Sequence, residues 1–547
     1  MNSLVLIVIA IIAFIVAYLT YGKWLAGKFG LDPTRPTPAH SMSDGVDYVP
    51  AKAPILLGHH FASIAGAAPI VGPIAAATFG WIPAYLWIVF GGIFFGAVHD
   101  FGSIVASVRH KGKSIGVVIN DTMGKTGKLL FNIFAWLTLI LVIAVFAIII
   151  ANTFVATPQA GTASILFMAV ALCFGFGVYR KNLPMFITTV IGVALLLVCI
   201  WVGIMFPLKL SFSTWVTLEM LYVFVASVIP VWVLLQPRDY LNSFLLYGLI
   251  VGSVIGLFLY HPTIQMTSYA GFKVGNNYLF PVLFVTIACG ALSGFHSLVG
   301  SGTTSKQLDK ETDARLIGYG GMLIESLLAV VALITAVMLA PDIYKEIMTK
   351  GGGAVPVFAS GTATFLATLG IPVATGKVFA SLVVSAFALT SLDTATRLGR
   401  YILQELFESA SSNKDAKGET ISSLNRYVAT IITIIPGAYL AYSGQGMAIW
   451  PIFGAANQLL AALALLAVSV WLIKSGKSSL FTQIPMYFIF SFTLTALALF
   501  SINNFKAGHT ALATLAVILF ILAIVLVVFA LQALKKSSNP SQTNAKA

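Results

Sequence analysis

The sequence has little charge and little cysteine. Asp, Glu, Lys and Arg make up only 9% of its 547 residues, whereas hydrophobic residues make up 59%, and the mean hydropathy is +0.95. Because an ordinary soluble domain carries about 25% charged residues, this composition excludes a soluble globular protein. The three cysteines all lie in apolar stretches and therefore indicate no disulfide framework: Cys173, Cys199 and Cys289.

Acidic residues are especially scarce, and the net charge is +13. The placement of the basic residues argues against a nucleic-acid partner. Apolar runs, each long enough to cross about 30 Å of hydrocarbon, divide the chain into about fifteen candidate spans, and most Lys and Arg fall in alternate connections. This asymmetry follows the positive-inside rule. We predict a multi-pass protein in the lipid bilayer, with its N-terminus outside and its C-terminus in the cytoplasm.

Two glycine-rich stretches interrupt segments long enough to span a membrane. Residues 58–73 and 289–304 align on Ser63 and Ser297. Lipid tolerates the backbone groups that Gly and Pro free only where these line a cavity or are buried in protein. Paired interruptions in two halves of a membrane protein indicate a secondary transporter's substrate site. We expect breaks at 63–69 and 290–302, whose half-helix N-termini would attract an anion, and a substrate site of these residues: Ser63, Gly66, Ala67, Ser293, Gly294, His296 and Ser297.

The two interrupted segments divide the chain into two sets of seven predicted spans. An odd number of spans per set inverts the second set relative to the first, as in many secondary transporters. Residues 393–412 resemble an amphipathic helix at the inner surface. The predicted organisation is a leading helix with a proline-rich lead-in (1–53), a first inverted repeat (54–278), a second inverted repeat (279–536) with a re-entrant or capping segment near 354–370, and a disordered cytoplasmic tail (537–547).

Several ionisable residues fall at membrane depth, where such groups are costly and mark functional sites by default. One interpretation is that each pairs internally and holds helices together. The other is a proton relay, to which we assign His60, His99, Asp100 and Glu325. No metal-ligand spacing is present among the histidines, so neither a metal nor another cofactor is predicted. Asn457 and Gln458, central in an apolar span, could hydrogen-bond between helices or line the pathway.

Several segments resemble the carbon-starvation protein A family. The matching stretches are residues 44–50, Gly58-His-His-Phe61, Gly96-Ala-Val-His-Asp-Phe101, Ser293-Gly-Phe-His296, residues 391–401 and residues 450–462. His99 stands where glutamine is more usual in that family. The resemblance implies uptake of peptides or pyruvate across the bacterial inner membrane, driven by protons. It also implies kinship with transporters of the LeuT-type fold, whose site is formed by two broken helices.

The sequence therefore predicts an all-α integral membrane protein with an inverted-repeat, LeuT-like architecture. Its expected function is proton-coupled import of a small carboxylate-bearing nutrient, a peptide or pyruvate, by alternating access. The alternatives are a sodium-coupled symporter, a passive channel, and a membrane-embedded metalloprotein that uses the histidines. No enzymatic activity is predicted, and the oligomeric state is left open.

Overall fold

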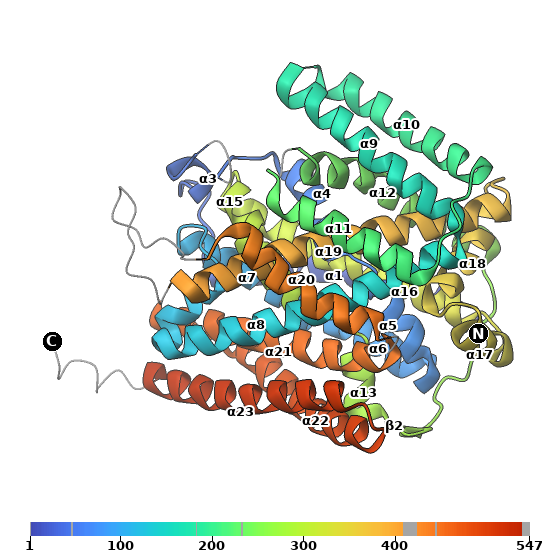
Figure 1. Ribbon diagram of the computed structural model, residues 1–547. Helices are drawn as coiled ribbons and strands as arrows, with labels where there is room; N and C mark the ends of the chain where they lie inside the picture. Colours follow the sequence, from blue (N-terminus) through green and yellow to red (C-terminus); the bar gives the residue numbers. More distant parts are fainter. Residues whose placement is uncertain are drawn as a thin grey trace, which may run out of the picture.

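The computed structural model describes residues 2–44, 48–181, 183–230, 233–408, 424–443 and 446–538. Within these residues the chain is almost entirely helical, and its long helices lie roughly along one direction (Figure 1). The predicted disordered tail falls mostly outside the described residues, because α23 ends at Ser538.

The first part of the chain leads into an interrupted helix and a long bent one. Its elements are α1 (Leu4–Leu19), α2 (Tyr21–Phe29), α3 (Pro38–Ser41), α4 (Ala53–Ile64), α5 (Ala68–Ala76), η1 (Ala77–Phe79), α6 (Trp81–Gly91), η2 (Gly92–Gly96) and α7 (Ala97–Arg109). Then follow α8 (Ile115–Ala156), α9 (Pro158–Lys181), α10 (Met185–Met205), α11 (Phe212–Val228), α12 (Leu235–Tyr260) and a two-stranded antiparallel ribbon of β1 (Lys273–Val274) and β2 (Asn277–Tyr278).

The second part opens with another interrupted helix. Its elements are α13 (Leu279–Thr286), α14 (Gly294–Val299), η3 (Gly300–Thr304), α15 (Ser305–Gln307), η4 (Glu311–Asp313), η5 (Arg315–Gly320) and α16 (Gly321–Val337). The remaining helices are α17 (Pro341–Lys350), α18 (Ala354–Ala367), α19 (Val373–Glu408), α20 (Arg426–Tyr442), α21 (Gly446–Lys474), α22 (Leu480–Lys506) and α23 (Thr510–Ser538). Short helices lie at both ends of the bundle, α3 and α15 at one end and α17 at the other (Figure 1).

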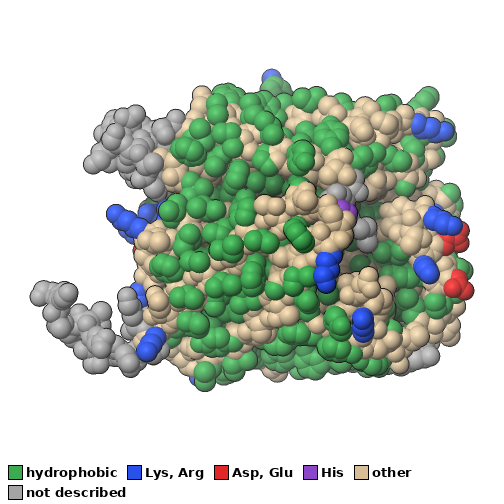
Figure 2. Space-filling model, turned by 60° about the horizontal axis from the view of Figure 1, so that its bottom comes forward, with side chains coloured by type: hydrophobic (Ala, Val, Ile, Leu, Met, Phe, Trp, Pro, Cys, Tyr) green, Lys and Arg blue, Asp and Glu red, His purple; other side chains and the backbone are tan. Residues whose placement is uncertain are grey.

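Eleven helices are long and apolar enough to cross a membrane, or twelve if the bent pair α4 and α5 forms one span, within the part of the chain that is described. Hydrophobic side chains cover most of the face shown in Figure 2. On α10, for example, Phe186 is 80% exposed and Trp201 is 59% exposed. An apolar surface of this kind suits contact with lipid.

The predicted count of fifteen spans is not confirmed. The three further spans expected from the sequence correspond to α11 and α20, with 17 residues each, and to the pair α13 and α14, whose halves contain eight and six residues. Length and composition therefore give eleven or twelve candidate spans among the described residues.

The expected surface helix at 393–412 is wrong. Residues 373–408 form the single 36-residue helix α19, which packs along α8, α18 and α20. Asp393 is only 1% exposed and Arg400 only 5% exposed. The sequence indicated a surface helix because of charged side chains such as Arg397 and Arg400, but both lie inside the bundle.

The two interrupted helices run in opposite directions against each other. The half before the first break, α4, contacts α14, which follows the second break; the half after the first break, α5, contacts α13, which precedes the second. α4 and α5 meet at an angle of 50°. This antiparallel contact is the arrangement that an inverted repeat requires.

The segment near 354–370 forms α18, a helix of 14 residues that packs against α5, α12, α16 and α19. At 1.5 Å per residue it is about 21 Å long, which is too short to cross about 30 Å of hydrocarbon. The preceding α17 is tied to α5 by a 2.7 Å hydrogen bond from the Tyr344 hydroxyl to the carbonyl oxygen of Ile74.

Candidate functional site

The first interruption leaves a gap at 65–67 between α4 and α5. The hydroxyl of Ser63 donates to the carbonyl oxygen of His59 at 2.9 Å, and Ala67 is the buried N-cap of α5. Gly66 approaches α19 so closely that an added Cβ would lie 2.4 Å from the Ser391 hydroxyl oxygen. A larger residue there would require the Ser391 side chain and the Phe146 ring to move, and the break is therefore packed directly against α19.

The second interruption lies at 287–293, between α13 and α14. The expectation of a break through 290–302 is therefore wrong in its second half, because Gly294–Val299 is an α-helix and Gly300–Thr304 continues it as one wider turn. A Cβ on Gly294 would lie 2.1 Å from the carbonyl oxygen of Asn457. This glycine permits close packing against α21 and does not unwind the helix.

Two neighbouring residues of α21 hydrogen-bond to the backbone groups at the two ends of the second break. The side-chain oxygen of Asn457 accepts from the backbone N–H of Phe295 at 2.8 Å, and its amide nitrogen donates to Ser293 Oγ at 2.9 Å. The amide of Gln458 donates to the carbonyl oxygens of Phe284 (2.9 Å) and Ile287 (3.3 Å). Helix ends carry backbone groups without intrahelical partners. Asn457 and Gln458 therefore bond between helices, which was one of the two roles considered for them.

A buried cluster of ionisable side chains joins α7, α14 and α16. Nδ1 of His99 lies 2.7 Å from Asp100 Oδ1, and Nδ1 of His296 lies 2.8 Å from Asp100 Oδ2. On its other side, Nε2 of His296 lies 3.5 Å from Glu325 Oε2. All four side chains are 0% exposed. One imidazole thus lies between two carboxylates, away from water.

His60 lies close to this cluster but is bonded elsewhere. It is fully buried, and its Nδ1 lies 2.8 Å from Thr304 Oγ1 on η3. A Cβ added to Gly321, one turn before Glu325 on α16, would lie 3.5 Å from the His60 ring. Three of the four residues predicted for a proton relay, His99, Asp100 and Glu325, therefore belong to the cluster of His296, whereas His60 links the first interrupted helix to the second.

A cavity of about 550 Å³ lies between α4, α8, the end of the second interrupted helix and α19. His59 and Ser63 line it from α4, whereas the neighbouring His60 does not. Its basic lining residues are Lys113, Lys306 and Arg397, and its acidic lining residue is Glu405. Because positive charges predominate, the cavity suits an anionic ligand. It adjoins connections rich in Lys and Arg.

Of the seven residues predicted to bind substrate, Ser63 lines this cavity. Ser293 bonds to Asn457, Ser297 donates to the carbonyl oxygen of Gly294 at 2.7 Å, and His296 bonds to Asp100. The other three are placed by packing as described: Gly66, Ala67 and Gly294. The structure thus gathers the predicted residues at two facing breaks, with the cavity beside the first.

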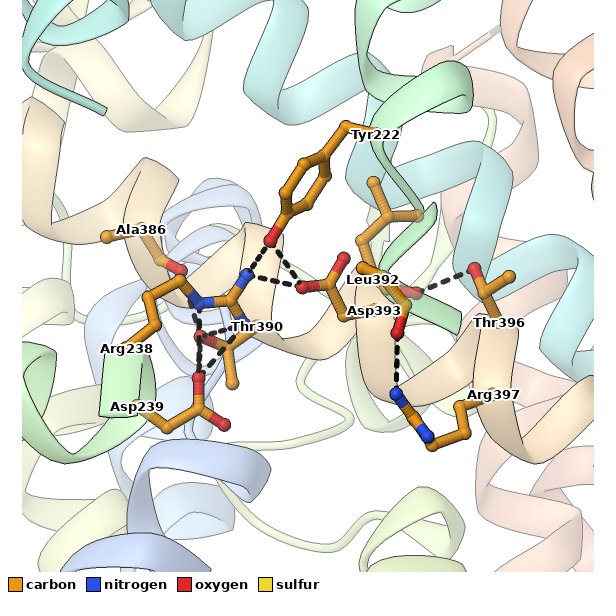
Figure 3. A network of polar contacts seen from close by, with 10 residues as sticks. Tyr222, Arg238, Asp239, Ala386, Thr390, Leu392, Asp393, Thr396 and Arg397 are labelled. Carbon is orange, nitrogen blue, oxygen red and sulfur yellow. Dashed lines mark hydrogen bonds and ion pairs between the residues drawn. The ribbon is translucent and has the colours of Figure 1, made fainter. Parts of the chain in front are cut away.

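A second buried network, shown in Figure 3, connects α11, α12 and α19. The guanidinium of Arg238 pairs with Asp239 at 2.9 Å, and it also contacts Asp393 and the hydroxyl of Tyr222. Tyr222 donates to Asp393 Oδ2 at 2.9 Å, and Thr390 donates to Asp239 Oδ1 at 3.0 Å. Arg238, Asp239 and Asp393 are at most 2% exposed.

Sequence reasoning missed Arg238 and Asp239, which it placed in a connection. The signal was an Arg-Asp pair directly before a long apolar run. Cys289 was also missed as a polar neighbour. Its sulfur, an imidazole nitrogen of His296 and a carboxylate oxygen of Glu325 all lie within 4.8 Å of one another. The histidine set considered for a metal did not include this cysteine.

Two facing interrupted helices with buried protonatable groups between them define a membrane transporter. The fold agrees with this class. Solved structures of an Eremococcus coleocola manganese transporter superpose with TM-scores of 0.54 for one mutant and 0.51 for a complex with an aromatic bis-isothiourea compound. Each covers 91% of this chain and 99% of its own, at 12 and 13% identity.

The chain belongs to the family described as carbon starvation protein CstA, which its residues 2–352 and 345–496 match. The peptide transporter CstA of Campylobacter jejuni is 35% identical over 90% of this chain and 79% of its own length. The pyruvate/proton symporter BtsT of Escherichia coli is 33% identical over 94% and 84%. The peptide transporter CstA of Bacillus subtilis is 31% identical over 87% and 86%. The resemblance seen in the sequence motifs is confirmed.

Proposed function

We propose that this transporter imports a peptide or pyruvate together with protons across the bacterial inner membrane by alternating access. The observation that carries the proposal is the position of His296. It lies on the second interrupted helix, between the carboxylates of Asp100 and Glu325, with all three side chains fully buried. The names of relatives, a peptide transporter and a pyruvate/proton symporter, support the substrate class and the coupling ion.

In this proposal the substrate binds at the two breaks and leaves towards the cytoplasm through the basic cavity. Lys113, Lys306 and Arg397 attract its carboxylate, and the N-terminus of α5 at Ala67 offers backbone donors and the positive end of a helix dipole. The proposed substrate residues remain Ser63, Gly66, Ala67, Ser293, Gly294, His296 and Ser297. Of these, Gly66 and Gly294 act by keeping the breaks tightly packed.

Proton coupling follows from the charge balance of the buried cluster. A protonated His296 offsets the charge of one of the two carboxylates beside it, whereas loss of that proton leaves both carboxylates without this compensation; uncompensated buried charge costs several kcal/mol. Movement of α14 away from Asp100 or Glu325 would therefore change which of these groups holds the proton. His99 and His60 extend the proposed relay towards α7 and α4.

The proposal includes the predicted topology. Fifteen crossings in an inverted-repeat, LeuT-like arrangement place the N-terminus outside and the C-terminus in the cytoplasm, with the basic cavity facing the cytoplasm. α11, α20 and the pair α13 and α14 then cross the membrane together with the longer helices. The antiparallel contact of the two interrupted helices supports this arrangement.

Uptake into proteoliposomes tests the function. Labelled pyruvate and a labelled dipeptide are supplied under an imposed pH gradient, sodium gradient or no gradient. We expect accumulation of one of them above equilibrium with the pH gradient alone. Accumulation that requires sodium would establish the sodium-coupled alternative, and equilibration without accumulation would establish a passive channel.

A further inference from the structure

We propose that Cys289, His296 and Glu325 form a binding site for a transition-metal cation of the Zn²⁺ type. Their ligand atoms lie within 4.8 Å of one another. All three residues are buried, with Cys289 the most exposed at 4%. Cys289 lies in the second break, His296 on α14 and Glu325 on α16. A tetrahedral Zn²⁺ site uses thiolate, imidazole and carboxylate ligands, and this set contains one of each.

The distance between His296 and Glu325 fits two ligands of one ion better than a hydrogen bond. Nε2 and Oε2 are 3.5 Å apart, whereas a normal N–H···O bond is about 2.7–3.2 Å. Metal–ligand distances of about 2.0–2.3 Å in a tetrahedron place neighbouring ligand atoms about 3.3–3.7 Å apart. His296 Nε2 and both oxygens of Glu325 have no hydrogen-bond partner among the described residues. These buried atoms are therefore available to a cation.

The surroundings of His296 resemble the outer shell of a metal site. Its Nδ1 is held by Asp100 Oδ2 at 2.8 Å, which favours the tautomer with hydrogen on Nδ1 and directs the Nε2 lone pair towards Glu325. A histidine bonded to a carboxylate in this way is the usual support for a metal-bound imidazole. The amide of Asn457 lies 4.0 Å from Cys289 Sγ and can donate to a thiolate there.

The three ligand types, a thiolate, an imidazole and a carboxylate, determine which cations the site prefers. A thiolate with an imidazole suits Zn²⁺ and similar ions, whereas Mg²⁺ and Ca²⁺ prefer oxygen ligands alone. Binding would release the thiol proton of Cys289, because the thiolate is the ligand. The three side chains leave the fourth tetrahedral position to water. The site shares His296 and Glu325 with the proposed proton relay, so the bound ion would compete with protons, but the inference itself rests on donor geometry and not on transport.

Direct metal binding tests the site. The full chain is purified in detergent without a histidine tag, stripped with chelator, and titrated with Zn²⁺ for affinity and with Co²⁺ for the thiolate-to-metal absorption band. The test variants are Cys289→Ser and Glu325→Gln. The controls are Cys199→Ser and Glu219→Gln, which change a buried cysteine on α10 and a buried glutamate on α11. Size-exclusion elution verifies that each variant is folded.

We expect one Zn²⁺ per chain in the unaltered protein and in both controls. Cys289→Ser should abolish the Co²⁺–thiolate band, and each test variant should weaken binding at least tenfold, since loss of even an outer partner costs about 10–100-fold. The proposal is overturned if the unaltered chain binds no Zn²⁺, or if folded Cys289→Ser and Glu325→Gln bind as tightly as the controls. Because no transport is measured, failure here leaves the proposed function standing, and failure of proton-driven uptake leaves this site standing.

Discussion

Asn457 and Gln458 are neighbours on α21, yet they hold opposite halves of one interrupted helix. Asn457 accepts from the first turn of α14 at 2.8 Å, and Gln458 donates to the last carbonyl groups of α13 at 2.9 Å. A break inside a membrane exposes backbone groups that lipid cannot satisfy. This pair provides the missing partners, so the break is a fixed part of the fold.

Asn457→Ala should destabilise the protein. It leaves the N–H of Phe295 and the hydroxyl of Ser293 without a buried partner, which costs about 1–3 kcal/mol, and the melting temperature in detergent should fall. Gln483→Ala is the matched control, because that amide bonds to Ser479 near the surface. Equal melting temperatures for the two variants would contradict the capping role.

Asp100→Asn should abolish gradient-driven accumulation and leave substrate exchange, because exchange needs no net proton movement. The change keeps the shape of the side chain but removes the carboxylate that His296 and His99 share. Uptake and exchange in proteoliposomes measure the two activities. Asp342→Asn, on the exposed first turn of α17, should retain both. If folded Asp100→Asn and His60→Gln variants remain driven by the pH gradient, both residues are structural only.

Gly66→Leu should stop transport while the protein still inserts into the membrane. The added side chain would collide with Ser391 on α19 and with Phe146 on α8 and would displace the first break. Gly294→Leu should instead impair folding, since it collides with the α21 backbone. Gly248→Leu on α12 is the control, because no atom lies within 4 Å of its added Cβ. Normal uptake by Gly66→Leu would refute a role for this break.

Lys113→Gln and Lys306→Gln should raise the KM for a carboxylate substrate supplied at the cytoplasmic face about 1.4- to fivefold each, because one partly hydrated ion pair contributes about 0.2–1 kcal/mol. Initial rates of substrate exchange, at several substrate concentrations on the cytoplasmic side, measure this change. Lys345→Gln on α17, at the far end of the bundle from α3 and α15 (Figure 1), should leave KM unchanged. Equal KM values in all three variants would remove the cavity from the substrate path.

Single cysteines at Ser114 and Lys350 should react with impermeant reagents from opposite faces of the membrane. Ser114 precedes α8 beside the basic cavity, and Lys350 ends α17. The background for this experiment lacks the three native cysteines. Labelling of both positions from the same side would exclude the proposed orientation.

The local sequence pattern was sufficient to predict that both membrane segments are interrupted. Glycine and proline weaken the helix in which they stand, so their effect can be predicted from the local sequence alone. The repeated motif around Ser63 and Ser297 indicated two related breaks. The pattern also predicted that Asp100 and Glu325 need partners, because lone charges are costly at membrane depth. It did not fix the register of the second break, which Asn457 and Gln458 determine from about 160 residues away in sequence.

The charged side chains of α19 show why the other features of the fold and the site could not be predicted from the sequence. Arg397 and Arg400 resemble a surface pattern when read along the chain, but Arg397 donates to the carbonyl oxygens of Ala226 and Ile229 at the end of α11. The neighbouring Asp393 pairs with Arg238. Partners separated by more than 150 residues leave no local periodicity. Cys289 was missed although His296 is near it in sequence, because the second break and the packing of α16 bring the three side chains together.

Because α19 is long, some of its polar residues lie within the hydrocarbon layer and others lie beyond it in contact with water and salt. Its 36 residues extend about 54 Å, whereas the hydrocarbon layer is about 30 Å thick, so a substantial part of the helix projects beyond the layer. Tyr401 and Glu405, at the cavity end, then face mobile ions that screen charges over about 8 Å at physiological ionic strength. Asp393, held by Arg238 inside the bundle, is shielded from those ions. Added salt should therefore screen the carboxylate of Glu405 from the charges around it without loosening the ion pair between Asp393 and Arg238, which lies about three turns deeper.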